Sequence, residues 1–169
     1  KLVSILFAVD KSHRVITRRN EKRNDTAVIG ESLNNAFKTG EVQNAYELVP
    51  RKFLLLEEES LAKLLSDLGL VHFVSVPVKK DGDVIAVLVA GIMISTNTSL
   101  GNSVYSQYGS ELAIFAGNPR NSLHLHATTS LPRSTWTMGQ ILPSEIHRII
   151  ALGHSYQDLL TVNEKEIIA

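Results

Sequence analysis

A group of cationic side chains stands at the end of a predicted strand, where it could recognise an anionic ligand. Arg18, Arg19 and Asn20 follow a β-favouring run and precede a predicted helix. Guanidinium groups form paired hydrogen bonds with carboxylates and phosphates, and the N–H groups at the start of a helix attract the same anions. Successive strand residues point to opposite faces, so at most one of the two arginines is expected to enter a pocket. The alternative is an ordinary solvated strand end.

Four polar residues in other predicted strands could complete such a site. His72 and Ser75 interrupt an apolar run, where a buried polar group needs a hydrogen-bond partner in the protein or in a ligand. Tyr46 and Glu47 lie on a further predicted strand and could face the same cavity. The alternatives are a core histidine bonded to a backbone carbonyl and an ordinary pair on an edge strand. The candidate ligand-binding residues are therefore Arg18, Arg19, Asn20, Tyr46, Glu47, His72 and Ser75.

Metal binding and catalysis find less support in the residue types. His124 and His126 share one face of a predicted strand, but no motif supplies a third metal ligand. The chain has no cysteine, which excludes disulfides, thiolate metal sites and thiol catalysis. It also lacks the Gly-x-Ser-x-Gly, P-loop and His-Glu-x-x-His motifs. We therefore expect no enzymatic activity, no metal site and no cofactor.

The composition is that of a globular protein with no nucleic-acid partner. Apolar residues make up 44% of the 169 residues and charged residues 20%, which suits one domain or two small ones. Basic and acidic residues number 17 each, so a large phosphate-neutralising surface is not expected. No run of 18 apolar residues occurs, so we expect no membrane span within this sequence.

Hydrophobic patterning predicts that an antiparallel sheet with flanking helices positions these residues. The predicted order is strand, strand, helix, strand, helix, strand, strand. Asp25 or Thr26 would cap the first helix, Gly40 would end it, and Glu57 to Glu59 would form the solvated start of the second. Asp81-Gly82 predicts a tight hairpin turn. The predicted strands cover residues 2–9, 14–18, 41–49, 70–78 and 84–94, and the predicted helices cover 26–38 and 60–68.

A polar stretch at residues 95–99 predicts a boundary between two domains, 1–95 and 96–169. Beyond it a similar order begins again, which we interpret as a weak internal repeat. No closing hairpin like that of residues 70–94 is expected in the second part, which therefore looks like a partial module. Its predicted elements are strands at 111–116, 123–129 and 157–162 and a helix that begins at Pro143.

Several segments resemble the extracytoplasmic double Cache domains of bacterial transmembrane receptors. Residues 15–20 (VITRRN) resemble the second strand of these domains, and residues 69–78 and 82–91 resemble their later hairpin. Residues 111–117, 126–129 and 138–139 are similar to parts of the next module. The amino-acid-binding signature of some family members is not recognisable, so the resemblance does not imply an amino-acid ligand.

The resemblance implies a PAS-like α+β fold and a role in sensing small molecules. The module would lie outside the cytoplasm, in a membrane-anchored protein, and would signal to a chemoreceptor, histidine kinase or cyclic-dinucleotide domain. The cationic candidates favour an anionic organic ligand bound by residues 1–95. The alternatives are a ligand-free dimerisation module and, more distantly, a small soluble α+β enzyme.

The two longest apolar strands predict that something must cover both faces of the sheet. The runs at residues 70–78 and 84–94 are apolar on both faces, as in strands at the middle of a sheet that is covered on each side. The predicted helices cover only part of this surface. We therefore expect a longer receptor with a transmembrane helix on each side of these residues, or a partner chain in a homodimer.

Overall fold

A computed structural model describes most of the chain. The described residues are 4–19, 26–27, 30–57, 59, 63, 65, 67–95, 97–118, 122–128, 139–152, 159–162 and 165–168. Backbone contacts divide the chain into two compact units, Lys1–Ser95 and Thr96–Ala169. Each unit is described by itself, and the first holds all seven candidate ligand-binding residues.

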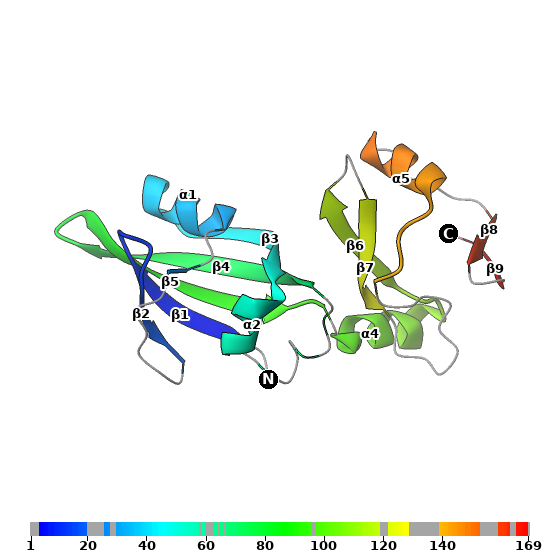
Figure 1. Cartoon of the computed structure of the whole chain (residues 1–169), viewed down its shortest axis with the longest axis horizontal. Coiled ribbons are helices and arrows are strands. Elements are labelled where there is room, and N and C mark those ends of the chain that lie inside the picture. The colour runs from blue at the N-terminus through cyan, green and yellow to red at the C-terminus, as the bar shows by residue number, and fades with distance from the viewer. Residues whose placement is uncertain are drawn as a thin grey trace. The chain divides into compact units, whose positions relative to one another are not determined.

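The first unit is built on a five-stranded antiparallel sheet (Figure 1). The strand order β2-β1-β5-β4-β3 places the two longest strands next to each other inside the sheet. The predicted order of strands and helices is confirmed, as is the prediction that both hairpins share one sheet. The strands are β1 (Ile5–Asp10), β2 (Val15–Arg18), β3 (Gln43–Pro50), β4 (Leu68–Lys80) and β5 (Asp83–Met93).

Side chains alternate between a buried inner face and an outer face of this sheet. Along β1, Ile5, Phe7 and Val9 are buried, whereas the residues between them are only partly buried. Helices α1 (Glu31–Thr39) and α2 (Arg51–Glu57) pack on the inner face, and their apolar residues join the strands in a single core cluster. Because side chains alternate between the two faces, only the polar strand residues on the inner face can contact α1 and α2.

The turn between β4 and β5 has the conformation that its residues predict. Asp81 and Gly82 have φ angles of 52° and 90°, both in the region that Asp-Gly supplies in tight hairpins. The register pairs Lys80 with Asp83 directly across the turn. This confirmed turn aligns the two long strands and so places Ser75 and His72 on their respective faces.

The two helices of the first unit begin at other residues than predicted. Thr26 pairs with Arg14 in an isolated β-bridge, so it does not cap a helix, and Asp25 lies outside the described residues. Helix α1 instead follows Gly30, and Gly40 ends it in the left-handed conformation, as predicted. Helix α2 covers residues 51–57, where no helix is predicted. Of the predicted helix 60–68, only residues 63, 65, 67 and 68 are described, and Leu68 already belongs to β4. The prediction of a solvated helix start is wrong for Glu57, whose side chain is buried, whereas Glu59 is helical and exposed, and its carbonyl oxygen accepts a hydrogen bond from the Lys63 N–H.

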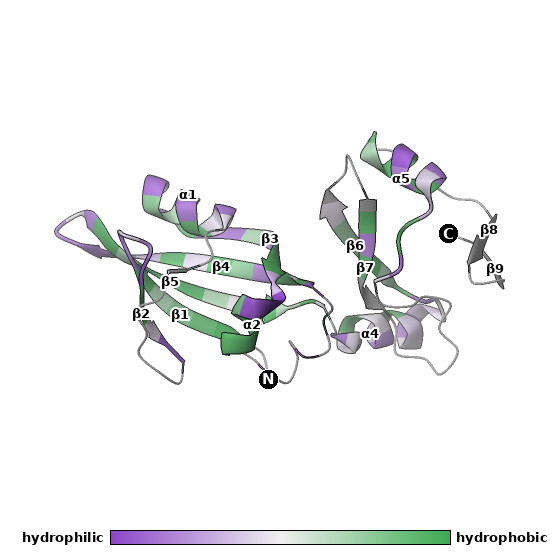
Figure 2. Ribbon diagram, viewed as in Figure 1, coloured by the Kyte–Doolittle hydropathy of each residue, from purple (hydrophilic) through white to green (hydrophobic). Residues whose placement is uncertain are grey.

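The outer face of the sheet stays largely open among the described residues. Val76, Val78, Leu88 and Ile92 are between 36% and 43% exposed although they lie on interior strands. Figure 2 shows hydrophobic colouring along β1, β4 and β5 that becomes hydrophilic toward the β4–β5 turn. The described helices therefore cover only part of the apolar surface of these strands, as the sequence predicts.

The second unit has more elements than the sequence predicts, and its strands form separate small sheets. An additional helix, α4 (Thr98–Tyr108), begins where Asn97 accepts a hydrogen bond from the Ser99 N–H. Strand β8 lies within the predicted strand 157–162, and it pairs with β9 in a hairpin whose strands have four residues each. Among the described residues of this unit, β6 pairs with β7 and β8 with β9. The other elements are β6 (Ala113–Asn118), β7 (Ser122–Thr128), α5 (Ser144–Ala151), β8 (Leu159–Val162) and β9 (Lys165–Ile168).

Candidate functional site

Arg18 is a buried cation on the inner face of the sheet. Its side chain is 3% exposed and forms an ion pair with Glu57, whose side chain is 2% exposed. The guanidinium carbon lies 5.5 Å from the centre of the Phe7 ring and 5.1 Å from the centre of the Phe53 ring. The guanidinium is therefore close to two aromatic rings and a carboxylate, an arrangement that stabilises a cation away from water.

Local sequence and strand register explain why these four side chains meet. Phe7 is paired directly with Arg18 across β1 and β2, so both point to the inner face. Phe53 and Glu57 are four residues apart on α2 and therefore lie on the same side of that helix. The Phe7 and Phe53 rings meet edge to face at 5.7 Å and join the strand pair to the helix pair. We call Phe7, Arg18, Phe53 and Glu57 the Arg18 cluster.

Burial makes the charges of the Arg18 cluster strongly interdependent. Removing an arginine and a carboxylate from water costs several kcal/mol per ion, and their attraction offsets this cost only when they stay paired. Such a pair is weak evidence for stability, since well-packed apolar residues can stabilise a core as well. A buried guanidinium needs an anionic partner, and Glu57 supplies one in this structure.

Ser75 and Glu47 also lie on the inner face, but they contact the start of α1. The Ser75 and Ser32 hydroxyl oxygens are 3.2 Å apart, and Glu47 accepts a hydrogen bond of 3.0 Å from the Ser32 N–H. The Glu47 carboxylate fits beside Gly30, where a Cβ atom would overlap it. These contacts cap α1 and give both predicted residues a structural partner within the protein.

Tyr46 and His72 lie on the outer face, opposite to Ser75 and Arg18. They are paired across β3 and β4, and their rings stack with centres 4.5 Å apart. Tyr46 is 68% exposed. Because His72 and Ser75 are three residues apart on one strand, their side chains leave opposite faces of the sheet. The candidate residues therefore do not all line one cavity within the first unit.

The remaining candidates flank Arg18 in the sequence. Arg19 is exposed, so only one of the two arginines is buried, and Asn20 lies outside the described residues. Sequence reasoning did not identify Phe7, Phe53 or Glu57 as members of a site. The spacing of Phe53 and Glu57 would have indicated a shared helix face, had a helix been predicted at residues 51–57.

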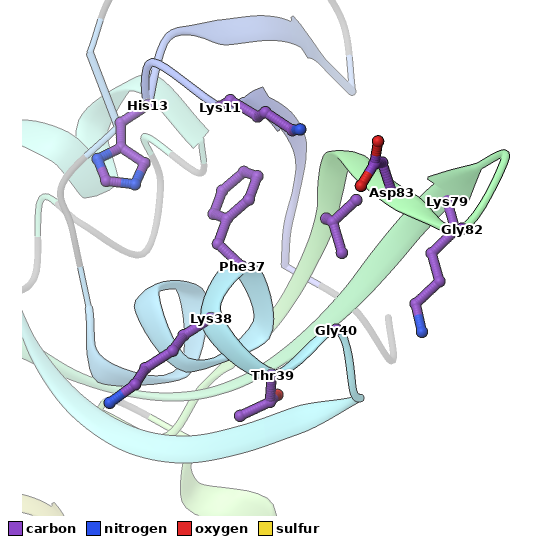
Figure 3. Close-up of a pocket in the computed structure, with 10 residues that line it drawn as sticks. Lys11, His13, Phe37, Lys38, Thr39, Gly40, Lys79, Gly82 and Asp83 are labelled. Carbon is purple, nitrogen blue, oxygen red and sulfur yellow. The ribbon is translucent and has the colours of Figure 1, made fainter.

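An open hollow lies near the β1–β2 and β4–β5 turns (Figure 3). It is an open cavity of about 480 Å³ whose lining includes three lysines and one aspartate. Figure 3 shows the Phe37 ring near the middle of the drawn side chains, with the ammonium groups of Lys38 and Lys79 pointing away from it. The ammonium groups of Lys38 and Lys79 therefore do not converge on one point in this cavity. Its lining consists of Lys11, His13, Phe37, Lys38, Thr39, Gly40, Lys79, Gly82, Asp83 and Val84.

Two further properties bear on the kind of site that the chain offers. Among the described residues, no three histidine, aspartate or glutamate side chains are grouped as metal ligands. The His124 ring lies beside the Gly139 carbonyl oxygen, with Nδ1 at 3.4 Å from it, and the His126 side chain lies outside the description. In the described part of the chain, no helix has the length and apolar character needed to cross a membrane.

Neither a protein-family model nor a curated protein matches the chain. Of the features described, the Arg18 cluster combines burial, charge and aromatic enclosure most closely.

Proposed function

We propose that residues 1–95 form a PAS-like, Cache-type module that senses a small organic anion. The observation that carries the proposal is the buried guanidinium of Arg18 on the helix-covered face of the sheet. The five-stranded antiparallel sheet and its two helices are consistent with a PAS-like fold. The proposed context is the extracytoplasmic part of a membrane-anchored bacterial receptor, as the resemblance implies.

The chemistry of Arg18 favours a carboxylate ligand. The planar guanidinium presents a fork of N–H donors that matches the two oxygens of a carboxylate, and it stays charged at every physiological pH. The rings of Phe7 and Phe53 provide apolar surface beside the fork for the hydrocarbon part of the ligand. The proposed role is binding, because the described neighbours of Arg18 supply an ion pair and aromatic contacts.

Signalling requires that the ligand prefer one of two conformations of the module. A ligand shifts such an equilibrium only by its difference in affinity for the two states. Helix α2 connects β3 to β4 and also contributes Phe53 and Glu57 to the Arg18 cluster. A ligand on Arg18 therefore acts directly on the position of α2, and through α2 on the long β4–β5 hairpin.

A thermal-shift screen of organic acids tests this proposal on the 169-residue chain. Ligand that binds only the folded state stabilises it by about 2.7 kcal/mol at 100 times its Kd. We expect at least one small carboxylate to raise the Tm in a saturable manner, and sodium chloride at equal ionic strength to have no such effect. If no acid in a panel of aliphatic, aromatic and hydroxy acids stabilises the chain beyond the salt control, the sensing proposal is rejected.

The open outer face favours a second candidate function, a homodimerisation module. The exposed side chains at its centre, among them Val76, Leu88 and Ile92, are uncharged, so two copies can approach without like-charge repulsion. Light scattering should then give twice the chain mass for the unmodified protein. Leu88→Asp should give the monomer mass with a circular-dichroism spectrum that is unchanged. A monomer mass for the unmodified chain at high micromolar concentration argues against this function.

A further inference from the structure

We infer that Glu57 is an internal competitor for the ligand, and that the ligand is a short monocarboxylate which displaces Glu57 from Arg18. This inference rests on the proposed function and names both its ligand class and its switch. Its starting point is that the Glu57 carboxylate already occupies the position on the buried guanidinium that a ligand carboxylate would take. The ligand is therefore expected to resemble the carboxylate end of the Glu57 side chain.

The position of Glu57 allows a ligand carboxylate to replace its own carboxylate on Arg18. Glu57 stands at the described end of α2, and its side chain meets Arg18 of strand β2. Displaced from Arg18, the Glu57 carboxylate can regain its hydration with a shift of the end of α2 only. The guanidinium meanwhile stays neutralised by the ligand, so no charge is left buried and unpaired.

The surroundings of Arg18 limit the class of ligand. The space that Glu57 would vacate is that of a carboxylate on a short hydrocarbon chain, and the Phe7 and Phe53 rings lie 5.5 and 5.1 Å from the guanidinium with which that carboxylate pairs. Arg18 is the only cation that the structure places in the Arg18 cluster, as far as its described residues show. A second acidic group on the ligand would therefore be buried without a counter-charge, which is costly. Aliphatic and aromatic monocarboxylates fit better than dicarboxylates.

This exchange also provides a signal. In the ligand-free state the Arg18–Glu57 ion pair connects α2 to the edge strand β2. In the bound state Arg18 contacts the ligand instead, and this ion pair between α2 and β2 is lost. The ligand therefore changes the connection between α2 and the sheet, which is the differential contact that a population shift requires.

Rescue by propionate tests the inference, because propionate reproduces the end of a glutamate side chain. In Glu57→Ala the competitor is gone and a carboxylate-sized space is left beside Arg18. We expect propionate to raise the Tm of this variant in a saturable manner, with a half-saturating concentration about tenfold or more below that of the unmodified chain. Propionamide has nearly the same shape without the charge, and it should give no stabilisation.

Glu59→Ala is the matched control, since Glu59 pairs with Lys63 at 2.7 Å on the surface, with both side chains more than 60% exposed. Propionate should affect it as it affects the unmodified chain. Should Glu57→Ala fail to fold, Glu57→Gln keeps the volume and removes only the competing charge. Calorimetry with propionate should then show about tenfold tighter binding to Glu57→Gln than to the unmodified chain.

The outcomes separate the inference from the function on which it rests. If an organic acid binds the unmodified chain through Arg18 and neither Glu57 variant binds propionate more tightly, the competitor role is wrong and the sensing function stands. If no acid binds the unmodified chain and the Glu57 variants gain nothing, both are rejected. Equal rescue of Glu57→Ala and of the double variant Arg18→Met/Glu57→Ala would overturn the inference, because the effect would not involve Arg18.

Discussion

Replacing Glu57 with alanine is expected to lower the free energy of unfolding by about 3–5 kcal/mol, one of the largest effects of any single substitution in the chain. The substitution removes the carboxylate that forms an ion pair with the buried Arg18 guanidinium beside two aromatic rings. Breaking a buried ion pair by removal of one partner costs about 3–5 kcal/mol. Urea denaturation monitored by circular dichroism measures the loss.

Two further variants show whether the loss comes from the buried charge. Glu59→Ala removes a surface carboxylate two residues away and should leave the unfolding free energy almost unchanged. Arg18→Met/Glu57→Leu removes both charges and should recover most of the stability, since apolar residues replace such pairs well. A double variant that is as unstable as Glu57→Ala would show that the ion pair stabilises the fold in its own right.

Replacing Phe53 with alanine is the second substitution with a large expected effect. Phe53 is 4% exposed, packs against Phe7 and covers the Arg18 guanidinium. Truncating a buried phenylalanine costs about 3–5 kcal/mol of unfolding free energy through lost burial and the cavity left behind. The measurement is again urea denaturation, carried out at low and at high potassium chloride.

Salt dependence distinguishes Phe53 from an ordinary core residue. Opening the space over Arg18 admits water and ions to the ion pair, so the stability of Phe53→Ala should fall further as salt screens the charges. Phe73 is 5% exposed in the same core and makes no ring contact with Arg18 among the contacts described. Phe73→Ala should therefore lose a similar free energy without the added salt dependence. Identical salt responses would contradict the role assigned to Phe53.

The sheet could be predicted from sequence because its signals are local. Alternating and continuous apolar runs predicted the five strands of the first unit, and Asp81-Gly82 predicted the turn between the two longest strands, β4 and β5. Helix α2 was not predicted because its apolar residues adjoin three consecutive glutamates, which resemble the solvated start of a later helix. Helix α4 was missed since its sequence, TSLGNSVYSQY, carries no continuous apolar stripe.

The candidate site could be predicted only in part, because its partners are distant in the sequence. Strand periodicity correctly indicated that only one of Arg18 and Arg19 enters the interior, and the structure buries Arg18. The same periodicity separates His72 from Ser75, which the sequence analysis did not take into account. The pairing of Arg18 with Glu57 joins residues 39 positions apart through tertiary packing, and no local pattern carries that information.

Isothermal titration calorimetry of Arg18 variants is the measurement that tests the central claim most directly. The titrant is the monocarboxylate that stabilises the unmodified chain most, and the variants are Arg18→Lys and, as a matched surface control, Arg14→Lys. Arg14 pairs with Asp10 at 3.2 Å and its side chain is 63% exposed. The account predicts one binding site per chain, unchanged in Arg14→Lys and weakened about tenfold or more in Arg18→Lys, because lysine keeps the charge but loses the paired hydrogen bonds. Equal affinity in a correctly folded Arg18→Lys would contradict it.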